Sequence, residues 1–211
     1  MGFEPSSASG VFSSIEDVVR DAAEGKVFIL LDDEDRENEG DFVVLADRVT
    51  PEAVSMMVRH GSGIVCLALS QQLADRLQLE LAPRRYVAAG STAFTSSIDA
   101  RYGITTGVSV QDRVKTILTA VSPGSKPDDL STPGHVFPVI AHPGGVTERA
   151  GHTEAGVAVA KLAGAEHAAV ICEMINADGT MSRLPEIMKF AAEHGVRVST
   201  IKQLIGYLGG T

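Results

Sequence analysis

The sequence predicts an α+β protein, a single domain over residues 1–211, in which helices cover both faces of a mixed, twisted sheet in a three-layer α-β-α sandwich. Three observations indicate this fold. Short apolar segments alternate with capped, amphipathic segments along the chain. Two early apolar segments are separated by only a polar turn, which adds one hairpin to that alternation. The 211 residues are 44% hydrophobic and contain no repeat or linker, so we expect one core.

The first elements are predicted by helix caps and by apolar runs between polar or glycine-rich breaks. Residues 1–12 are rich in serine and glycine, and we expect them to be poorly ordered. Serine or threonine marks each helix start, Pro51 occupies a first helical position, and Gly25 ends the first helix. The signals predict a helix at 14–24, strands at 27–31 and 42–46, a helix at 50–60, a strand at 64–69 and a helix at 70–79.

The second half is predicted from the same signals. An apolar run at 93–98 indicates a strand, Ser109 caps a helix to about residue 120, and the polar composition of 122–133 indicates a surface loop. A strand at 135–141 contains Pro138, which cannot donate to a sheet, so we expect it at an edge or a bulge. The remaining predictions are a helix at 153–162, a buried strand at 168–175, a helix at 184–194, a strand at 196–199 and a helix at 200–208.

Charge and composition exclude several classes of function. A net charge of −9 and a pI near 5.1 argue against nucleic acid or an anionic membrane as the main partner. No apolar segment approaches the roughly 18 residues of a membrane span, and the N-terminus does not read as a secretory signal, so we expect a cytoplasmic protein. Cys66 and Cys172 lie in apolar runs, which suits buried, reduced thiols; Cys66 becomes relevant to chemistry if its strand opens onto a site.

The most unusual segment is 32–41, which holds seven carboxylates and one arginine in ten residues. Seven negative charges and one positive charge give −6 of the total of −9. Because strands anchor both ends of the segment, its carboxylates are crowded. Two unit charges 4 Å apart repel by about 4 kcal/mol at an effective dielectric near 20. The carboxylates therefore meet a cation or a proton, or they point outward into solvent, and both interpretations remain open.

A second segment, Arg149 to Glu154, lies where a loop enters a helix. Backbone amides at a helix N-terminus and a neighbouring arginine favour a phosphate, which would place His152 beside the phosphorylated molecule. The alternative is that Thr153 is an ordinary N-cap and His152 a surface residue. Combined with the acidic segment, an imidazole near carboxylates indicates a divalent cation beside an anion site, and this pairing suits a phosphorylated sugar.

Three further positions are candidates for chemistry. His135 follows a Pro-Gly pair at the start of a strand, which suits a general acid or base as well as a structural role. Glu173 lies within an apolar run, where a carboxylate is costly unless it is functional or paired, for example with Arg183. Thr105 to Gly107 could supply hydroxyls and amides, although this signal is weaker.

These motifs together closely resemble the 3,4-dihydroxy-2-butanone 4-phosphate synthase family of riboflavin biosynthesis, from about residue 12 to 208. The resemblance implies conversion of D-ribulose 5-phosphate to L-3,4-dihydroxy-2-butanone 4-phosphate and formate by a lyase. It also implies dependence on Mg²⁺, which Mn²⁺ could replace, and a homodimer with active sites near the subunit interface. The motifs that carry it are 32–41, RHGSGIVCL at 59–67, 105–107 with Asp112 and Arg113, PGHVFP at 133–138, GGVTERAGHTE at 144–154, 171–173 and DGTMSR at 178–183. Two departures are Ile140, where an arginine is expected, and Ser96, where an aliphatic residue is usual.

Carried over by position, the resemblance implies roles for individual residues. The implied metal ligands are Glu37 and His152. The implied substrate contacts are Arg36, Glu37, Asp41, Thr106, Arg149, Ala150, Gly151, His152, Thr153 and Glu173. The implied catalytic residues are His135 and Glu173, with Asp33, Glu39 and Cys66 at other active-site positions. In this hypothesis a metal at the C2 carbonyl and C3 hydroxyl eases removal of the C3 proton, and acids with His135 move protons through dehydration, a skeletal shift and hydration before C4 leaves as formate.

Two other functions fit parts of the pattern. A sugar-phosphate isomerase or aldolase would share the metal, the phosphate site and the enediolate, but would release no formate. A noncatalytic nucleotide- or RNA-binding module would need a basic groove and aromatic platforms, whereas this acidic chain has no Trp and three Tyr. The acidic segment and residues 84–92 are candidates for movement over a substrate.

Overall fold

The sheet at the centre of the molecule is mixed, as predicted. The computed structural model describes residues 12–83, 85 and 91–210. Within them, eight strands form a sheet in the order β4-β6-β3-β7-β2-β1-β8, with β5 beside β6. The pairs β1–β8 and β3–β6 are parallel, and the other pairs are antiparallel. The strands are β1 Phe28–Leu31, β2 Gly40–Leu45, β3 Cys66–Leu69, β4 Ala93–Phe94, β5 Ile98–Ala100, β6 Leu130–Ile140, β7 Ala168–Glu173 and β8 Arg197–Thr200.

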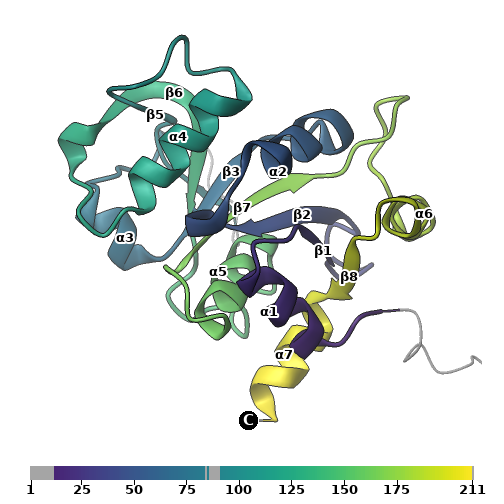
Figure 1. Ribbon diagram of the computed structural model, residues 1–211. Coiled ribbons are helices and arrows are strands. Elements are labelled where there is room, and N and C mark those ends of the chain that lie inside the picture. Colours follow the sequence, from purple (N-terminus) through teal and green to yellow (C-terminus); the bar gives the residue numbers. More distant parts are fainter. Residues whose placement is uncertain (1–11, 84, 86–90, 211) are drawn as a thin grey trace, which may run out of the picture.

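Helices cover both faces of this sheet, which confirms the three-layer sandwich (Figure 1). One face is covered by α1 Ile15–Ala23, α5 His152–Leu162 and α7 Ile201–Gly209. The other face is covered by α2 Pro51–Met56, α3 Gln71–Arg76, α4 Val110–Val121 and α6 Leu184–His194. All residues of β2 are buried, and their side chains alternate between the two faces. Phe42 and Val44 pack in the core under α2, α3, α4 and α6, whereas Val43 and Leu45 pack in the core under α1, α5 and α7. Burial of each such side chain stabilises the fold by about 1.5–3 kcal/mol, which explains an uninterrupted apolar run.

The predicted helix ends are confirmed by their hydrogen bonds. A hydroxyl accepts a backbone N–H three residues later at Ser14, Thr50, Ser70, Ser109 and Thr200. Each such cap contributes about 1 kcal/mol. Gly25 and Gly195 follow their helices with φ of 78° and 65°, in the left-handed region that favours glycine.

Three predictions about strands were wrong. The strand predicted at 93–98 is two strands, because the chain changes its pairing on β6: Phe94 lies opposite Val139, and a register shift follows Ile98. The loop predicted at 122–133 ends early, since Leu130 already pairs with β5. Pro138 is at neither an edge nor a bulge: β6 lies between β4 and β3, and Pro138 pairs in regular register with Leu67. The irregular pairing of β6 with β5 lies before it, between Ser131 and Val136. In each case the strand is defined by a distant partner rather than by its own pattern of apolar residues.

Other expectations are only partly covered by the structure. Residues 1–11 and most of 84–92, for which we predicted poor order and movement, lie outside the described residues. Cys66 and Cys172 are free and buried, as predicted. Ile140, one of the two departures, is buried in the core rather than exposed. None of the helices in the described residues is both long and apolar enough for a transmembrane span.

Candidate active site

Segments that are distant in the sequence meet at one end of the central strands. The acidic segment connects β1 to β2, and Asp41 of β2 lies opposite Glu173 of β7. The N-terminal end of α5 approaches from the adjacent layer and brings His152 to the same place. A cleft of about 260 Å³ lies between them. The predicted site residues that line this cleft are Arg36, Glu37, Glu39, Asp41, Cys66, Arg149, His152, Thr153 and Glu173.

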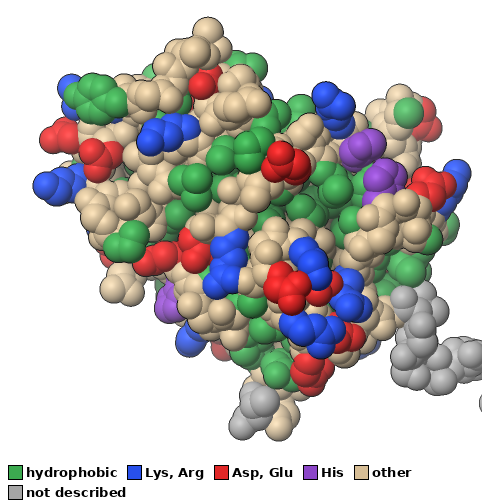
Figure 2. Space-filling model, in the orientation of Figure 1, with side chains coloured by type: hydrophobic (Ala, Val, Ile, Leu, Met, Phe, Trp, Pro, Cys, Tyr) green, Lys and Arg blue, Asp and Glu red, His purple; other side chains and the backbone are tan. Residues whose placement is uncertain are grey.

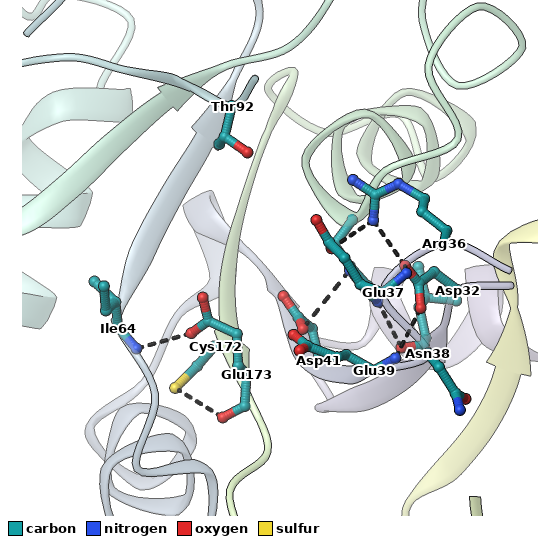
Figure 3. A network of polar contacts seen from close by, with 12 residues as sticks. Asp32, Arg36, Glu37, Asn38, Glu39, Asp41, Ile64, Thr92, Cys172 and Glu173 are labelled. Atoms are coloured by element: carbon teal, nitrogen blue, oxygen red, sulfur yellow. Dashed lines mark hydrogen bonds and ion pairs between the residues drawn. The ribbon is translucent and has the colours of Figure 1, made fainter. Parts of the chain in front are cut away.

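Asp32 organises the acidic segment from inside (Figure 3). Its buried carboxylate accepts the backbone N–H groups of Glu39 at 2.8 Å and Glu37 at 3.2 Å. It also accepts the Arg36 guanidinium at 2.7 Å, which in turn contacts the Glu37 carboxylate at 2.5 Å. Arg183, the N-cap of α6, donates to the carbonyl oxygen of Glu37 at 2.9 Å. These bonds fold the segment into a defined loop, although the sequence analysis assigned Asp32 no role.

The crowded carboxylates divide into two groups, so both interpretations of the acidic segment hold for part of it. Glu37, Glu39 and Asp41 face the cleft. Asp33 and the two acids that follow it are exposed and lie outside the cleft lining. The carboxylate of Asp33 accepts the backbone N–H of Asp35 at 3.0 Å, which stabilises the turn. The structure therefore does not bring Asp33 to the position implied for a catalytic residue.

Glu37 and His152 lie together as a possible cation site. Ligand atoms of Asp32, Glu37 and His152 are all within 4.8 Å of one another. The Nε2 of His152 is 3.2 Å from the carbonyl oxygen of Leu30, so it carries a hydrogen and donates, which leaves Nδ1 free to act as a ligand. Burial lowers the pKa of His152, which favours the neutral, metal-binding imidazole. The donor set of carboxylates and one imidazole fits a divalent cation.

The position of His152 decides between the two interpretations of its segment. The N-cap of α5 is Gly151, not Thr153, and no side chain caps the helix. His152 is the first helical residue and only 6% exposed. The interpretation as an ordinary N-cap beside a surface histidine is therefore wrong. Ala150 is exposed, and neither Ala150 nor Gly151 is among the residues that line the cleft.

Asp41 is a buried carboxylate close to His152. It is 3% exposed, and its Oδ1 has no hydrogen-bond donor among the described residues. The same atom is 3.8 Å from Nδ1 of His152. Burial, followed by the neighbouring charge of Glu173, raises the pKa of Asp41 well above its ordinary value. A buried carboxylate in this situation is stable when it holds a proton or lies near a cation, which again fits a divalent ion.

We expect Asp41→Asn to stabilise the metal-free protein at pH 8 by about 2 kcal/mol. The pKa of Asp41 is higher in the folded protein than in the unfolded chain. Its contribution to the free energy of unfolding is therefore fully present below the unfolded-state pKa and is lost as pH rises through the folded-state pKa. Asparagine has the same shape and no charge, so the gain should vanish near pH 4. Urea unfolding in EDTA at both pH values measures this. The exposed neighbour Asp35→Asn is the control, and a loss of stability at pH 8 in Asp41→Asn would contradict the prediction.

The opposite wall of the cleft holds Arg149. Its guanidinium donates to the Glu154 carboxylate at 2.6 Å and to the Thr92 hydroxyl at 3.1 Å. Glu154 is only 2% exposed and also accepts the backbone N–H of His142 at 2.8 Å. A Cβ at Gly151 would collide with the Arg149 guanidinium, so a larger residue there would displace that group from its present position. Neither Glu154 nor Thr92 was predicted as a site residue from the sequence, although Glu154 lies inside the 149–154 motif.

Glu173 is oriented by a backbone N–H, and no Lys or Arg side chain among the described residues forms an ion pair with it. Its Oε2 accepts the backbone N–H of Ile64 at 2.8 Å (Figure 3). Arg183, the partner in the alternative interpretation, instead donates to carbonyl oxygens of the acidic segment, so that interpretation is wrong. Cys66 lies on the cleft, as expected if its strand opens onto a site. Burial first, and then the charge of Glu173, raises the pKa of its thiol, so it is not an activated nucleophile.

His135 and Thr106 are not among the residues that line this cleft. Nδ1 of His135 is 2.8 Å from Oδ2 of Asp99, and its backbone N–H donates to Oδ1 at 3.0 Å. Asp99, which the sequence analysis missed, is buried, while the His135 side chain is 40% exposed. Gly107, with φ of 90°, packs against both groups, and Thr106 beside it is exposed. Asp99 thus orients the accessible imidazole of His135, which lies apart from the acidic residues of the cleft.

Comparison with known proteins gives consistent matches. A family-wide sequence profile for 3,4-dihydroxy-2-butanone 4-phosphate synthase matches residues 16–207. A protein of that name from Neisseria meningitidis serogroup A is 51% identical over 199 residues, 94% of this chain and 55% of that protein. The chain thus spans about half the length of the curated relatives it matches.

Two solved structures share the fold over most of this chain. RibBX, a two-domain 3,4-dihydroxy-2-butanone 4-phosphate synthase from A. baumannii, is 49% identical with a TM-score of 0.89, covering 92% of this chain and 57% of that one. A 3,4-dihydroxy-2-butanone 4-phosphate synthase in complex with two magnesium ions is 37% identical with a TM-score of 0.91, covering 95% and 98%.

Proposed function

The chain belongs to the 3,4-dihydroxy-2-butanone 4-phosphate synthase family, and from that premise we propose that it is a lyase of riboflavin biosynthesis. It converts D-ribulose 5-phosphate to L-3,4-dihydroxy-2-butanone 4-phosphate and formate. One observation carries this proposal: carboxylates and the imidazole of His152 face the Arg149 guanidinium across a single cleft. A cation site beside an anion site matches a substrate that has adjacent oxygens at one end and a phosphate at the other.

Glu37 and His152 would hold Mg²⁺, with Asp32 within ligand distance of both. The buried Oδ1 of Asp41, which has no hydrogen-bond donor among the described residues, supports this assignment, because a nearby cation would stabilise the ionised carboxylate. When bound, Mg²⁺ supplies a Lewis acid that polarises the carbonyl and stabilises an enediolate. Imidazole is an unusual ligand for Mg²⁺, so Mn²⁺ should also support the reaction.

The remaining roles follow from position and charge. Arg149 and the backbone amides at the start of α5 bind the phosphate, because both present positive charge to the cleft. Burial first, and then the charge of Glu37, raises the pKa of Glu39, and the pKa of Asp41 is raised as well. A carboxyl group of this kind can take a proton from carbon or oxygen and return it later in the sequence. Glu173 faces the same space with its carboxylate held by backbone.

A homodimer would bring His135 into this arrangement. Side chains that flank His135 and Glu173 are exposed and apolar, with Phe137 at 36% and Ile64 at 45% exposure. Val108, on the loop beside His135, is 51% exposed. Such side chains favour contact with a second subunit. We therefore place His135 of one subunit at the cleft of the other, where it would act as a general acid or base.

Mixing two inactive variants tests the shared site. His135→Ala and Glu37→Gln should each lose formate release, and a mixture of refolded subunits should regain about a quarter of wild-type activity, because half of the dimers are mixed and each has one intact site. A mixture that stays inactive while forming mixed dimers would show that both residues act within one chain.

The reaction itself is tested by formate release from ribulose 5-phosphate. With Mg²⁺ we expect one formate per ribulose 5-phosphate consumed, and EDTA should lower the rate at least about a hundredfold, with recovery on addition of Mg²⁺ or Mn²⁺. An isomerase would yield an aldose, and an aldolase would yield two- and three-carbon fragments. Either product without formate would contradict the assignment.

Glu154→Gln tests the phosphate site. The substitution preserves size but removes the charged partner of Arg149, so we expect KM for ribulose 5-phosphate to rise about tenfold while kcat changes less than about threefold. Steady-state kinetics measure the two parameters separately. Glu148→Gln, an exposed acid in the same loop, is the matched control and should change neither. A fall in kcat at constant KM would exclude a role for Arg149 in holding the substrate's phosphate.

A further inference from the structure

A cluster of three rings lies on the surface beside α6, outside the cleft. The ring centroids of His60 and His194 are 5.2 Å apart, and both histidines are exposed. Phe190 stacks on His194 at 3.9 Å and contacts His60 at 5.4 Å. Figure 2 shows histidine side chains gathered at the surface in this part of the molecule. Neither imidazole has a role in the proposed reaction.

Hydrogen bonding prepares His194 to bind a ligand. Its Nδ1 is 3.0 Å from the carbonyl oxygen of Phe190, and a carbonyl only accepts, so Nδ1 carries the hydrogen. The lone pair of the neutral ring therefore lies on Nε2. Metal-binding histidines in proteins commonly have this arrangement, in which a backbone carbonyl sets the tautomer. A second imidazole, that of His60, lies close to it.

We propose that His60 and His194 form a binding site for a transition metal ion of the Zn²⁺ class. Imidazole nitrogen favours Zn²⁺, Ni²⁺ and Cu²⁺ over Mg²⁺, whereas the carboxylates that accompany His152 in the cleft favour Mg²⁺ and Mn²⁺, so the two sites would differ in the ions they prefer. In the described part of the chain, the one cluster of three close ligand groups is Asp32, Glu37 and His152. The histidine pair therefore has no third protein ligand in such a cluster, and water would complete the coordination of a bound ion.

An ion at this site would connect two segments that shape the cleft. His60 is followed in the chain by Ile64, whose backbone N–H orients Glu173. His194 ends α6, and Arg183 at the other end of that helix holds the backbone of the acidic segment. Zn²⁺ between the two histidines would therefore tie the C-terminal end of α6 to the segment that positions Glu173.

Zn²⁺ titration of the full chain tests the proposal. The titration uses the His152→Ala variant, which lacks the imidazole of the cleft. Tight Zn²⁺ binding that remains in this variant is then assigned to His60 and His194. We expect one Zn²⁺ per chain by calorimetry and a rise of about 4 °C in Tm at saturation. Adding His60→Ala or His194→Ala to that background should each weaken binding at least about tenfold and abolish the rise in Tm. Mg²⁺ should produce neither effect.

His167→Ala in the same background is the matched control, because His167 is also an exposed histidine and lies elsewhere on the surface. It should leave Zn²⁺ affinity unchanged. His60→Gln and His194→Gln repeat the test with smaller changes in packing, and their Tm without Zn²⁺ shows that each variant is folded. The proposal is overturned if Zn²⁺ does not bind in the His152→Ala background, or if binding is equally strong without either histidine.

Discussion

Glu37→Gln is expected to lower the rate of formate release by about a thousandfold. The change preserves the size of the side chain but removes a negative charge from the group formed with Asp32 and His152. Since carboxylates are the preferred ligands of Mg²⁺, its affinity should fall at least about tenfold. The loop itself should keep its shape, because the backbone N–H of Glu37 and the Arg36 guanidinium remain bonded to Asp32.

Calorimetric titration with Mg²⁺ and a formate assay measure these two effects separately. Glu34→Gln is the matched control, because Glu34 is exposed in the same segment and does not line the cleft. It removes the same formal charge and should change neither quantity by more than about twofold, since exposed charges are screened. Wild-type affinity for Mg²⁺ in Glu37→Gln would remove Glu37 from the ligand set.

Gly63→Ala is expected to have the second largest effect. A Cβ at this position would lie 2.8 Å from the backbone nitrogen of Glu173 and 2.7 Å from its carbonyl oxygen, and it would also contact the carboxylate. β7 cannot move away, because it is paired with β2 and β3 on its two sides. The segment that contains Gly63 must shift instead, and the bond from Ile64 to Glu173 is then lost. We expect a cost of about 2 kcal/mol in stability and about a hundredfold loss of activity.

Gly206→Ala separates this effect from the general effect of adding a methyl group. Nothing lies within 4 Å of a Cβ at Gly206, which is inside α7. Alanine there should leave activity unchanged and stabilise the protein by about 0.5–1 kcal/mol through its higher helix propensity. Urea unfolding and the formate assay apply to both variants. Wild-type activity in Gly63→Ala would mean that the orientation of Glu173 does not depend on this close approach.

The sequence by itself determined the features that depend on neighbouring residues. The hydroxyl caps at Ser14, Ser109 and Thr200 act over three residues, and Gly195 ends α6 by its own backbone conformation. Periodic burial likewise reflects local pattern, so the strand Ala168–Glu173 and the three-layer arrangement could be predicted. The long motifs also located most residues of the cleft, because they carry the family resemblance.

Only the tertiary structure decided which side chains meet. Asp33 and Asp41 are equivalent acids by composition, yet one faces solvent and the other is buried without a donor for Oδ1 among the described residues. Glu154 and Asp99 gain their importance from partners that the fold supplies, the first from Arg149 and the second from His135, 36 residues away. The division of the 93–98 strand has the same origin. Hydrogen bonds and burial between distant segments depend on how the chain packs, and no local pattern encodes them.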